Sequence, residues 1–145
     1  MALQLSAEHI AIIRREAEQG YADEVCGFLY GRDNGDDREI LDVVPVVNQQ
    51  DHNRARRFLV TPEQFRAAEA RARRSGQDLL GIYHSHPDHP AIPSEYDREH
   101  ALPFYSYVIV SVRGGTSAEL RSWLLLDDRG GYAEEAIRQL SPSYS

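Results

Sequence analysis

The sequence predicts an α/β fold in which a mixed β-sheet is flanked by helices. Short apolar runs rich in β-branched and aromatic residues alternate with segments that carry helix caps and helical periodicity. No repeat, low-complexity block or linker interrupts the 145 residues. A chain of this length suits one domain with a substantial core. We therefore expect residues 1–145 to form a single domain.

The chain is expected to begin with a helix and to continue into a strand. Ser6 is a good N-cap for Ala7–Glu18, whose apolar residues suit an amphipathic helix, and Gly20 follows as a stop. The next apolar run, Val25–Gly31, is β-prone and is closed by a turn-rich stretch, so we interpret it as a strand.

A second strand and a loop are expected next. Ile40–Val47 is again apolar, but Pro45 lacks an N–H and restricts this strand to a sheet edge or a bulge. Asn48–Arg57 is polar and predicts a loop, and Phe58–Val60 predicts a short strand after it.

The second predicted helix has a well-marked start. Thr61 is a good N-cap, Pro62 occupies the first helical position, and Gln64 completes a capping box. This helix should run to about Arg74, with Gly76 as its stop.

The remaining segments are mainly β-prone. Leu79–His84 predicts a short buried strand, and Tyr105–Arg113 with Glu119–Leu126 predicts a hairpin around two glycines. Tyr132–Leu140 is compatible with a last helix or with a strand, and its pattern does not decide between them.

Composition excludes several classes of protein. Sixteen basic and 23 acidic residues give a net charge of −7, which argues against nonspecific nucleic-acid binding. The single cysteine, Cys26, excludes an internal disulfide and every cysteine-rich zinc site. No stretch approaches the ~20 apolar residues that a membrane span needs, and the charged N-terminal segment does not resemble a secretory signal. We expect a cytoplasmic protein with no nucleic-acid or membrane partner.

The most informative stretch joins a strand end to a helix start. It reads His84-Ser85-His86-Pro87 and continues, after six residues, with Ser94 and then Asp97. Side chains two apart on a strand point to the same face, so the two histidines should converge while Ser85 points away. Ser94 is a good N-cap, and it places Asp97 in the first helical turn, where the helix dipole favours a carboxylate.

This pattern suits a metal ion. Two imidazoles and one carboxylate can supply three protein ligands to one zinc ion and leave the fourth position to water, which is typical of hydrolytic sites. Each half of the pattern also has an ordinary structural explanation, as a helix cap or as a histidine pair on a strand. Their combination at one junction favours one zinc per chain, bound by His84, His86 and Asp97.

Hydrolysis also needs a general base, and the motif contains no spare carboxylate. Glu24 stands directly before the strand Val25–Gly31 and is the best candidate. On the local pattern alone, a solvated glutamate at a strand entrance is the more ordinary explanation.

Two segments resemble the JAMM (MPN-plus) zinc metallopeptidases. The run Glu24–Gly31 (EVCGFLYG) is similar to the Glu-x-x-Gly-x-Leu-x-Gly strand of that family, and the stretch from His84 to Asp97 fits its metal motif without a gap. The flanking order of helices and strands also agrees. The resemblance implies a cytidine-deaminase-like α/β sandwich.

The resemblance also implies a role for each position. His84, His86 and Asp97 would bind zinc, Glu24 would carry a proton from water to the leaving amine, and Ser94 would help to hold the developing oxyanion.

The resemblance further implies a substrate. The family cuts peptide or isopeptide bonds after the C-terminus of ubiquitin-like proteins, and its compact bacterial members look like partners of sulfur-carrier proteins that end in Gly-Gly. We expect hydrolysis of the bond after that Gly-Gly, either in carrier maturation or in the release of an amino acid such as cysteine.

Three other functions are weaker. A zinc nucleobase deaminase shares the expected architecture, but its signature needs more than one cysteine. A non-catalytic MPN scaffold would be a binding module, and the complete ligand set argues against it. A DNA-repair-associated relative has a similar His-x-His-Pro motif, but the net charge of −7 disfavours it.

Three further residues have no firm role in the sequence. His89 could shape a substrate channel, although a solvated loop residue is the more ordinary explanation. His100 could orient a metal ligand from one turn beyond Asp97, but a surface or packing role is more ordinary. Cys26 is most simply a packing residue. The oligomeric state is not indicated by any pattern.

Overall fold

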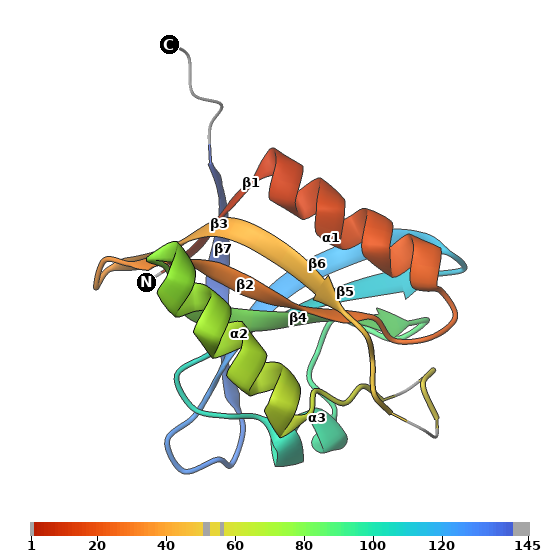
Figure 1. The fold of residues 1–145 in the computed structure, drawn as a ribbon. Coiled ribbons are helices and arrows are strands. Elements are labelled where there is room, and N and C mark those ends of the chain that lie inside the picture. Colours follow the sequence, from red (N-terminus) through yellow and green to blue (C-terminus); the bar gives the residue numbers. More distant parts are fainter. Residues whose placement is uncertain (1, 51–52, 56, 141–145) are drawn as a thin grey trace.

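The computed structural model describes residues 2–50, 53–55 and 57–140 (Figure 1). The elements follow one another as β1 (Ala2–Ser6), α1 (Ala7–Gly20), β2 (Cys26–Asp33), β3 (Asp37–Val46), α2 (Pro62–Ser75), β4 (Asp78–Pro87), α3 (Glu95–His100), β5 (Ser106–Arg113), β6 (Thr116–Leu125) and β7 (Tyr132–Leu140). No helix among these described residues is long and apolar enough to cross a membrane.

The strands form one mixed sheet that closes on itself in the order β1-β3-β2-β4-β5-β6-β7. Closure depends on β1, which pairs in parallel with β3 on one side and with β7 on the other. The strand β4 lies between an antiparallel partner, β2, and a parallel partner, β5. The predicted mixed sheet with flanking helices is confirmed, but β1 was not predicted.

Two apolar clusters pack the two faces of the sheet, with α1 on one face and α2 on the other (Figure 1). Leu29 of β2 belongs to the cluster with α1, whereas its neighbours Phe28 and Tyr30 belong to the cluster with α2. The alternation of side chains along a strand produces this division. Ile82 of β4 also packs in the α2 cluster, so the residues two and four positions further along β4 face the same side.

Both long helices have the predicted caps. The Ser6 hydroxyl accepts a hydrogen bond from the His9 N–H at the start of α1, over 3.0 Å. Thr61 and Gln64 form the reciprocal capping box at the start of α2. Gly76 ends this helix with φ +67°, a left-handed conformation that glycine adopts without strain.

Pro45 lies in the part of β3 that pairs with a strand on one side only, which agrees with the predicted edge position although β3 itself lies between β1 and β2. It pairs with Gly27 of β2, while the pairing of β3 with β1 ends at Glu39. The missing N–H of the proline therefore interrupts no pairing with β1.

The structure corrects or completes three expectations. Phe58–Val60 is not a strand: the Leu59 N–H donates to the Asn48 side chain over 3.0 Å, so the connection is held by a side-chain amide. The strand β4 continues to Pro87 because parallel pairing with β5 extends that far. Tyr132–Leu140 is the strand β7. Of the predicted loop Asn48–Arg57, residues 51–52 and 56 lie outside the described residues.

Candidate metal centre

Four buried side chains converge at the end of β4. The carboxylates of Glu24 and Asp97 and the imidazoles of His84 and His86 each offer one ligand atom, and these atoms all lie within 4.8 Å of one another. Nε2 of His84 lies 3.1 Å from Nε2 of His86 and 3.3 Å from Oδ2 of Asp97. Nε2 of His86 lies 3.1 Å from the same Asp97 oxygen. The structure thus brings together the three predicted ligands and the predicted base.

The β2–β4 pairing places Glu24 beside the histidines. Cys26 pairs with His84 in an antiparallel register, so Glu24, two residues before Cys26, comes level with the end of β4. Ser85 points away from the histidine face, as predicted, and its hydroxyl accepts the Val25 N–H over 2.9 Å. The Ser85 N–H in turn donates to the Val25 carbonyl over 3.0 Å. These two hydrogen bonds fix the chain next to Glu24.

The segment that carries Asp97 is fixed by a capping box at the start of α3. The Ser94 hydroxyl accepts the Asp97 N–H over 3.1 Å, and the Ser94 N–H donates to Oδ2 of Asp97 over 2.9 Å. The Ser-x-x-Asp pattern is therefore a true helix cap, and the same cap aims the carboxylate at the histidines. Ser94 itself is exposed beside the cluster.

The two imidazoles are held by different contacts. Nδ1 of His86 lies 2.8 Å from the Pro90 carbonyl, so this nitrogen carries the proton and Nε2 is left with a free lone pair. The His84 ring stacks on Phe58, with 4.3 Å between centroids. Burial lowers the pKa of His84, which favours the neutral form that binds metals.

The two carboxyl groups have opposite protonation tendencies. Burial raises the pKa of Glu24 to about 9, and the nearby Asp97 carboxylate adds to this rise. Burial also opposes ionisation of Asp97, but the two histidines outweigh it and hold the pKa of Asp97 well below its usual range. Asp97 is therefore the permanent anion of the cluster, and Glu24 is the group that can take up a proton.

The cluster fits a cation better than it fits a hydrogen-bond network. In the neutral tautomer of His86 that binds a metal, with the proton on Nδ1, the Nε2 lone pair would face the ionised Asp97 oxygen 3.1 Å away, and two acceptors would be in contact. A cation between them removes this repulsion. Two atoms bound to one zinc ion at about 2.0–2.1 Å in tetrahedral geometry lie about 3.3 Å apart. The observed separations of 3.1 and 3.3 Å are close to that value.

The family of the chain follows from comparison with known proteins. Residues 6–126 match the model of a family described as prokaryotic homologs of the JAB domain. The chain belongs to this prokaryotic JAB family. The resemblance to JAMM peptidases that was noted in the sequence is thereby confirmed at the level of the family.

Several relatives of this JAB domain are curated proteins. The desampylase of Haloferax volcanii is 35% identical over 121 residues, which cover 80% of this chain and 85% of the relative. The CysO-cysteine peptidase of Mycobacterium tuberculosis is 31% identical over 138 residues, covering 93% and 89%. A probable TtuB-protein conjugate cleaving protease of Thermus thermophilus is 36% identical over 110 residues, covering 76% and 68%. The prediction that the chain is an enzyme of the peptidase class is confirmed.

Solved structures have the same fold. A protein from Desulfitobacterium hafniense superposes with a TM-score of 0.84 at 31% identity, over 97% of this chain and 94% of the other. A JAB1/MPN domain protein from Archaeoglobus fulgidus superposes with a TM-score of 0.55 at 18% identity, over 96% and 97%. The second match shows the fold alone.

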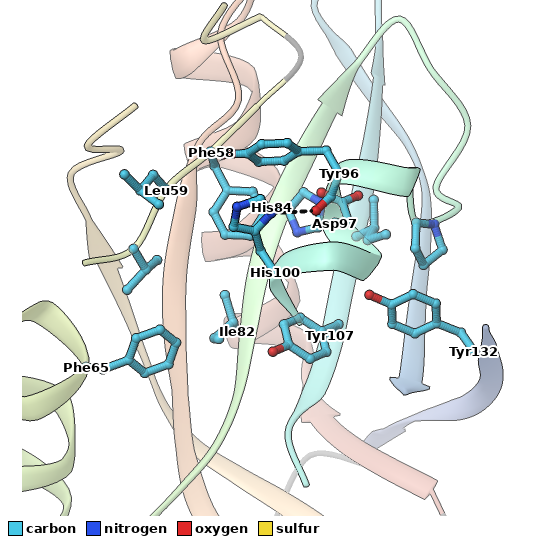
Figure 2. A pocket seen from close by; sticks show the side chains of 13 residues that line it. Phe58, Leu59, Phe65, Ile82, His84, Tyr96, Asp97, His100, Tyr107 and Tyr132 are labelled. Carbon is cyan, nitrogen blue, oxygen red and sulfur yellow. Dashed lines mark hydrogen bonds and ion pairs between the residues drawn. The ribbon is translucent and has the colours of Figure 1, made fainter. Parts of the chain in front are cut away.

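Two hollows flank the cluster of this JAB domain. One is an open pocket lined by Glu24, His86 and Ser94, together with His89, Pro90 and Ile92. The other is a mostly apolar chamber on the side of His84 and Asp97, shown in Figure 2. A substrate in the open pocket would meet both the predicted base and the predicted hydroxyl donor.

Sequence reasoning missed Asn48, whose side chain makes hydrogen bonds to the main chain both at Glu24 and in the loop that follows β3. Its amide nitrogen donates to the main-chain carbonyls of Glu24 and Arg57, in both cases over 3.0 Å. Its amide oxygen accepts the N–H groups of Gln50 and Leu59 over 2.9 and 3.0 Å. An asparagine after a strand has no local signature that distinguishes it from an ordinary turn residue.

His89, His100 and Cys26, whose roles the sequence left open, lie in different surroundings. His89 lines the open pocket and is partly exposed, so its role in a substrate channel stays a prediction. The His100 ring stacks on Tyr96, 4.1 Å between centroids, and its Nδ1 lies 2.9 Å from the Tyr96 carbonyl, so its contacts do not support the orienting role. Cys26 is fully buried, and burial raises the pKa of its thiol to about 12, which favours the packing interpretation.

Proposed function

We propose that this protein is a zinc-dependent peptidase that hydrolyses the bond after the C-terminal Gly-Gly of a ubiquitin-like sulfur-carrier protein. The observation that carries the proposal is the convergence of three metal-type ligands with one further buried carboxylate. The Cys26 thiol, which is free, suits a reducing compartment, so we place the reaction in the cytoplasm.

His84, His86 and Asp97 are the residues that would hold one zinc ion per chain. Two nitrogens and one oxygen are a common ligand set for catalytic zinc, and three protein ligands leave one position open. When bound, zinc polarises a carbonyl group and lowers the pKa of water to about 7.

Glu24 is the proposed general base and later the general acid. Its Oε1 atom is buried and has no hydrogen-bond partner among the described residues, so it is available to a water molecule. The raised pKa means that Glu24 holds a proton at neutral pH in the zinc-free protein. A cation held by His84, His86 and Asp97 would favour the ionised carboxylate, which could then accept a proton from the attacking water and deliver it to the leaving amine. Proton transfer of this kind contributes typically 10²–10⁴-fold to the rate.

Ser94 is the proposed donor to the developing oxyanion. Its oxygen already accepts the Asp97 N–H, which leaves the hydroxyl hydrogen free to donate. The residue is exposed and lines the same pocket as Glu24. A substrate carbonyl in that pocket can receive the hydrogen bond when negative charge accumulates on its oxygen.

The substrate class is supported by the relatives. Two of them carry names that describe cleavage of a CysO-cysteine or a TtuB-protein conjugate, and a third is a desampylase. A non-catalytic scaffold is disfavoured because the ligand set, the base candidate and the hydroxyl donor are all present around one pocket.

The test is mass spectrometry of sulfur-carrier proteins that extend beyond Gly-Gly, incubated with the zinc-loaded protein and with Glu24→Gln. We expect the wild type to cut after Gly-Gly and the variant to bind the same amount of zinc without cutting. Intact carriers despite one bound zinc per chain would contradict the carrier substrate. Equal cutting by Glu24→Gln would instead remove Glu24 from the mechanism.

A further inference from the structure

The second hollow beside the metal centre has no role in the chemistry described so far. It is a chamber of ≈ 90 Å³ that lies between the sheet and the helices α2 and α3. Its apolar wall comes from elements far apart in the sequence: Phe58, Phe65, Ile82, Tyr107, Ile109 and Tyr132. Figure 2 shows most of these side chains, together with His84 and Asp97 at one end of the chamber.

The chamber directly adjoins the proposed reaction centre. His84 and Asp97 are part of its lining, whereas Glu24 and Ser94 line the open pocket instead. The proposed metal ligands therefore separate a polar side, with the base and the hydroxyl, from an apolar side. A group that occupied the chamber would contact His84 and Asp97, two of the proposed metal ligands.

The chemistry of the wall selects the kind of occupant. Among the described residues that line the chamber, Asp97 is the sole carboxylate and none is an arginine. The Asp97 carboxylate lies within 3.1–3.3 Å of the two histidines. Apart from the two proposed ligands, the polar residues of the wall are His100 and three tyrosines, so a carboxylate placed here would lose its hydration without meeting an arginine. An aliphatic side chain would fill space in which the wall atoms otherwise lack contacts. Since a cavity of about 150 Å³ holds benzene, a chamber of ≈ 90 Å³ suits a smaller, aliphatic group.

We propose that this chamber is the subsite for an aliphatic side chain on the leaving residue, the one that follows the Gly-Gly of the carrier. The inference rests on the proposed peptidase function. Both terminal carrier residues are then glycines and have no side chain to insert. The side chain nearest to the cut bond therefore belongs to the residue that leaves.

The first test compares carriers whose Gly-Gly is extended by one residue: glycine, leucine, aspartate or tryptophan. One methylene in an apolar pocket changes kcat/KM by about 10-fold or more, so we expect leucine to exceed glycine and aspartate by at least about tenfold. Tryptophan should fall below leucine because it exceeds the space. Equal kcat/KM for leucine and glycine, in a protein that cuts both, would overturn the subsite.

A variant that reduces the chamber provides the second comparison. Val60 lines the chamber and is only partly buried, so Val60→Phe adds bulk there with little risk to the fold. The preference for leucine over glycine should collapse toward unity in this variant. Val44→Phe is the matched control, because Val44 packs against the same apolar cluster outside the chamber. Its preference should equal that of the wild type.

Binding to the zinc-free protein separates this proposal from the peptidase function. Aromatic ring resonances are followed by NMR while L-leucine or L-aspartate is added. We expect saturable shifts with leucine in the wild type and in Val44→Phe, and none with aspartate or in Val60→Phe. Absence of any shift with leucine would refute the subsite, even if carriers are cut. Shifts without cleavage of any carrier would refute the peptidase proposal and keep the aliphatic site.

Discussion

Asn48 donates from its side-chain amide to the main-chain carbonyl of Glu24 over 3.0 Å. The same amide group makes three further hydrogen bonds to the loop that carries Phe58, whose ring stacks on His84. The Asn48 side chain therefore connects the main chain at Glu24, the proposed base, to the loop whose Phe58 ring packs against His84, a proposed ligand. Outer contacts of this kind orient catalytic groups without touching the substrate.

We expect Asn48→Ala to lower kcat by about 10–100-fold while zinc binding persists, by analogy with the loss of supporting contacts around metal sites. KM should change little, because Asn48 does not line the open pocket. Steady-state kinetics on an extended carrier, with zinc measured by elemental analysis, provide the test.

A second variant, Asn48→Asp, distinguishes a role in positioning Glu24 from a role in stabilising the loop. It keeps an acceptor for the N–H groups of Gln50 and Leu59 but cannot donate to the Glu24 carbonyl. If the role is to position Glu24, Asn48→Asp should lose kcat as Asn48→Ala does. A variant with normal kcat and a lower melting temperature would show that Asn48 only stabilises the loop.

The raised pKa of Glu24 predicts how stability depends on pH in the zinc-free protein. Between the ordinary value of 4.5 and the folded value of about 9, the native state holds a proton that the unfolded state has released. Stability is therefore fully present below the lower value and falls as pH rises, by at most about 1.4 kcal/mol per pH unit. Glu24→Gln should remove this loss.

Urea unfolding from pH 4 to pH 8 in the presence of a chelator checks that expectation. The variant should match the wild type at pH 4 and become progressively more stable above it. Parallel curves for the two proteins would mean that Glu24 ionises freely in the fold.

Ser94→Ala should have two separable effects. Loss of the N-cap of α3 should lower the free energy of unfolding by about 0.5–2 kcal/mol, and loss of the oxyanion donor should lower kcat by about 10²–10³-fold. Ser94→Thr retains both the cap and the hydroxyl, so it should recover most of each. Thermal unfolding and kinetics are measured on the same preparations. A kcat that falls only in proportion to stability would leave Ser94 as a cap alone.

Asp97→Ala should abolish zinc binding, because it removes one of three protein ligands and the anion that faces both histidines. A ligand that binds only the native state raises stability, by about 4 kcal/mol when it is present at 1,000 times its dissociation constant. Zinc should therefore raise the melting temperature of the wild type and leave that of Asp97→Ala unchanged. Full zinc occupancy in the variant would show that the ligand assignment is wrong.

Much of the local structure could be predicted because it depends on interactions between residues that are close in the sequence. The caps at Ser6, Thr61 and Ser94 depend on side chains that bond to the backbone three residues ahead. The shared face of His84 and His86 follows from the two-residue period of a strand. Tyr132–Leu140 remained undecided because its pattern is ambiguous and one of its two partner strands, β1, lies at the other end of the chain.

By itself, the sequence determined the types and the spacing of the proposed ligands, the helix start that aims Asp97, and the family that these patterns resemble. Only the tertiary structure decided that Glu24 is buried beside the histidines, since this depends on the register of β2 against β4. It also decided the role of Asn48, the closure of the sheet by β1 and the existence of the apolar chamber. The reason is physical: caps and strand faces arise from contacts within a few residues, whereas registers, side-chain bridges and cavities arise where distant segments meet.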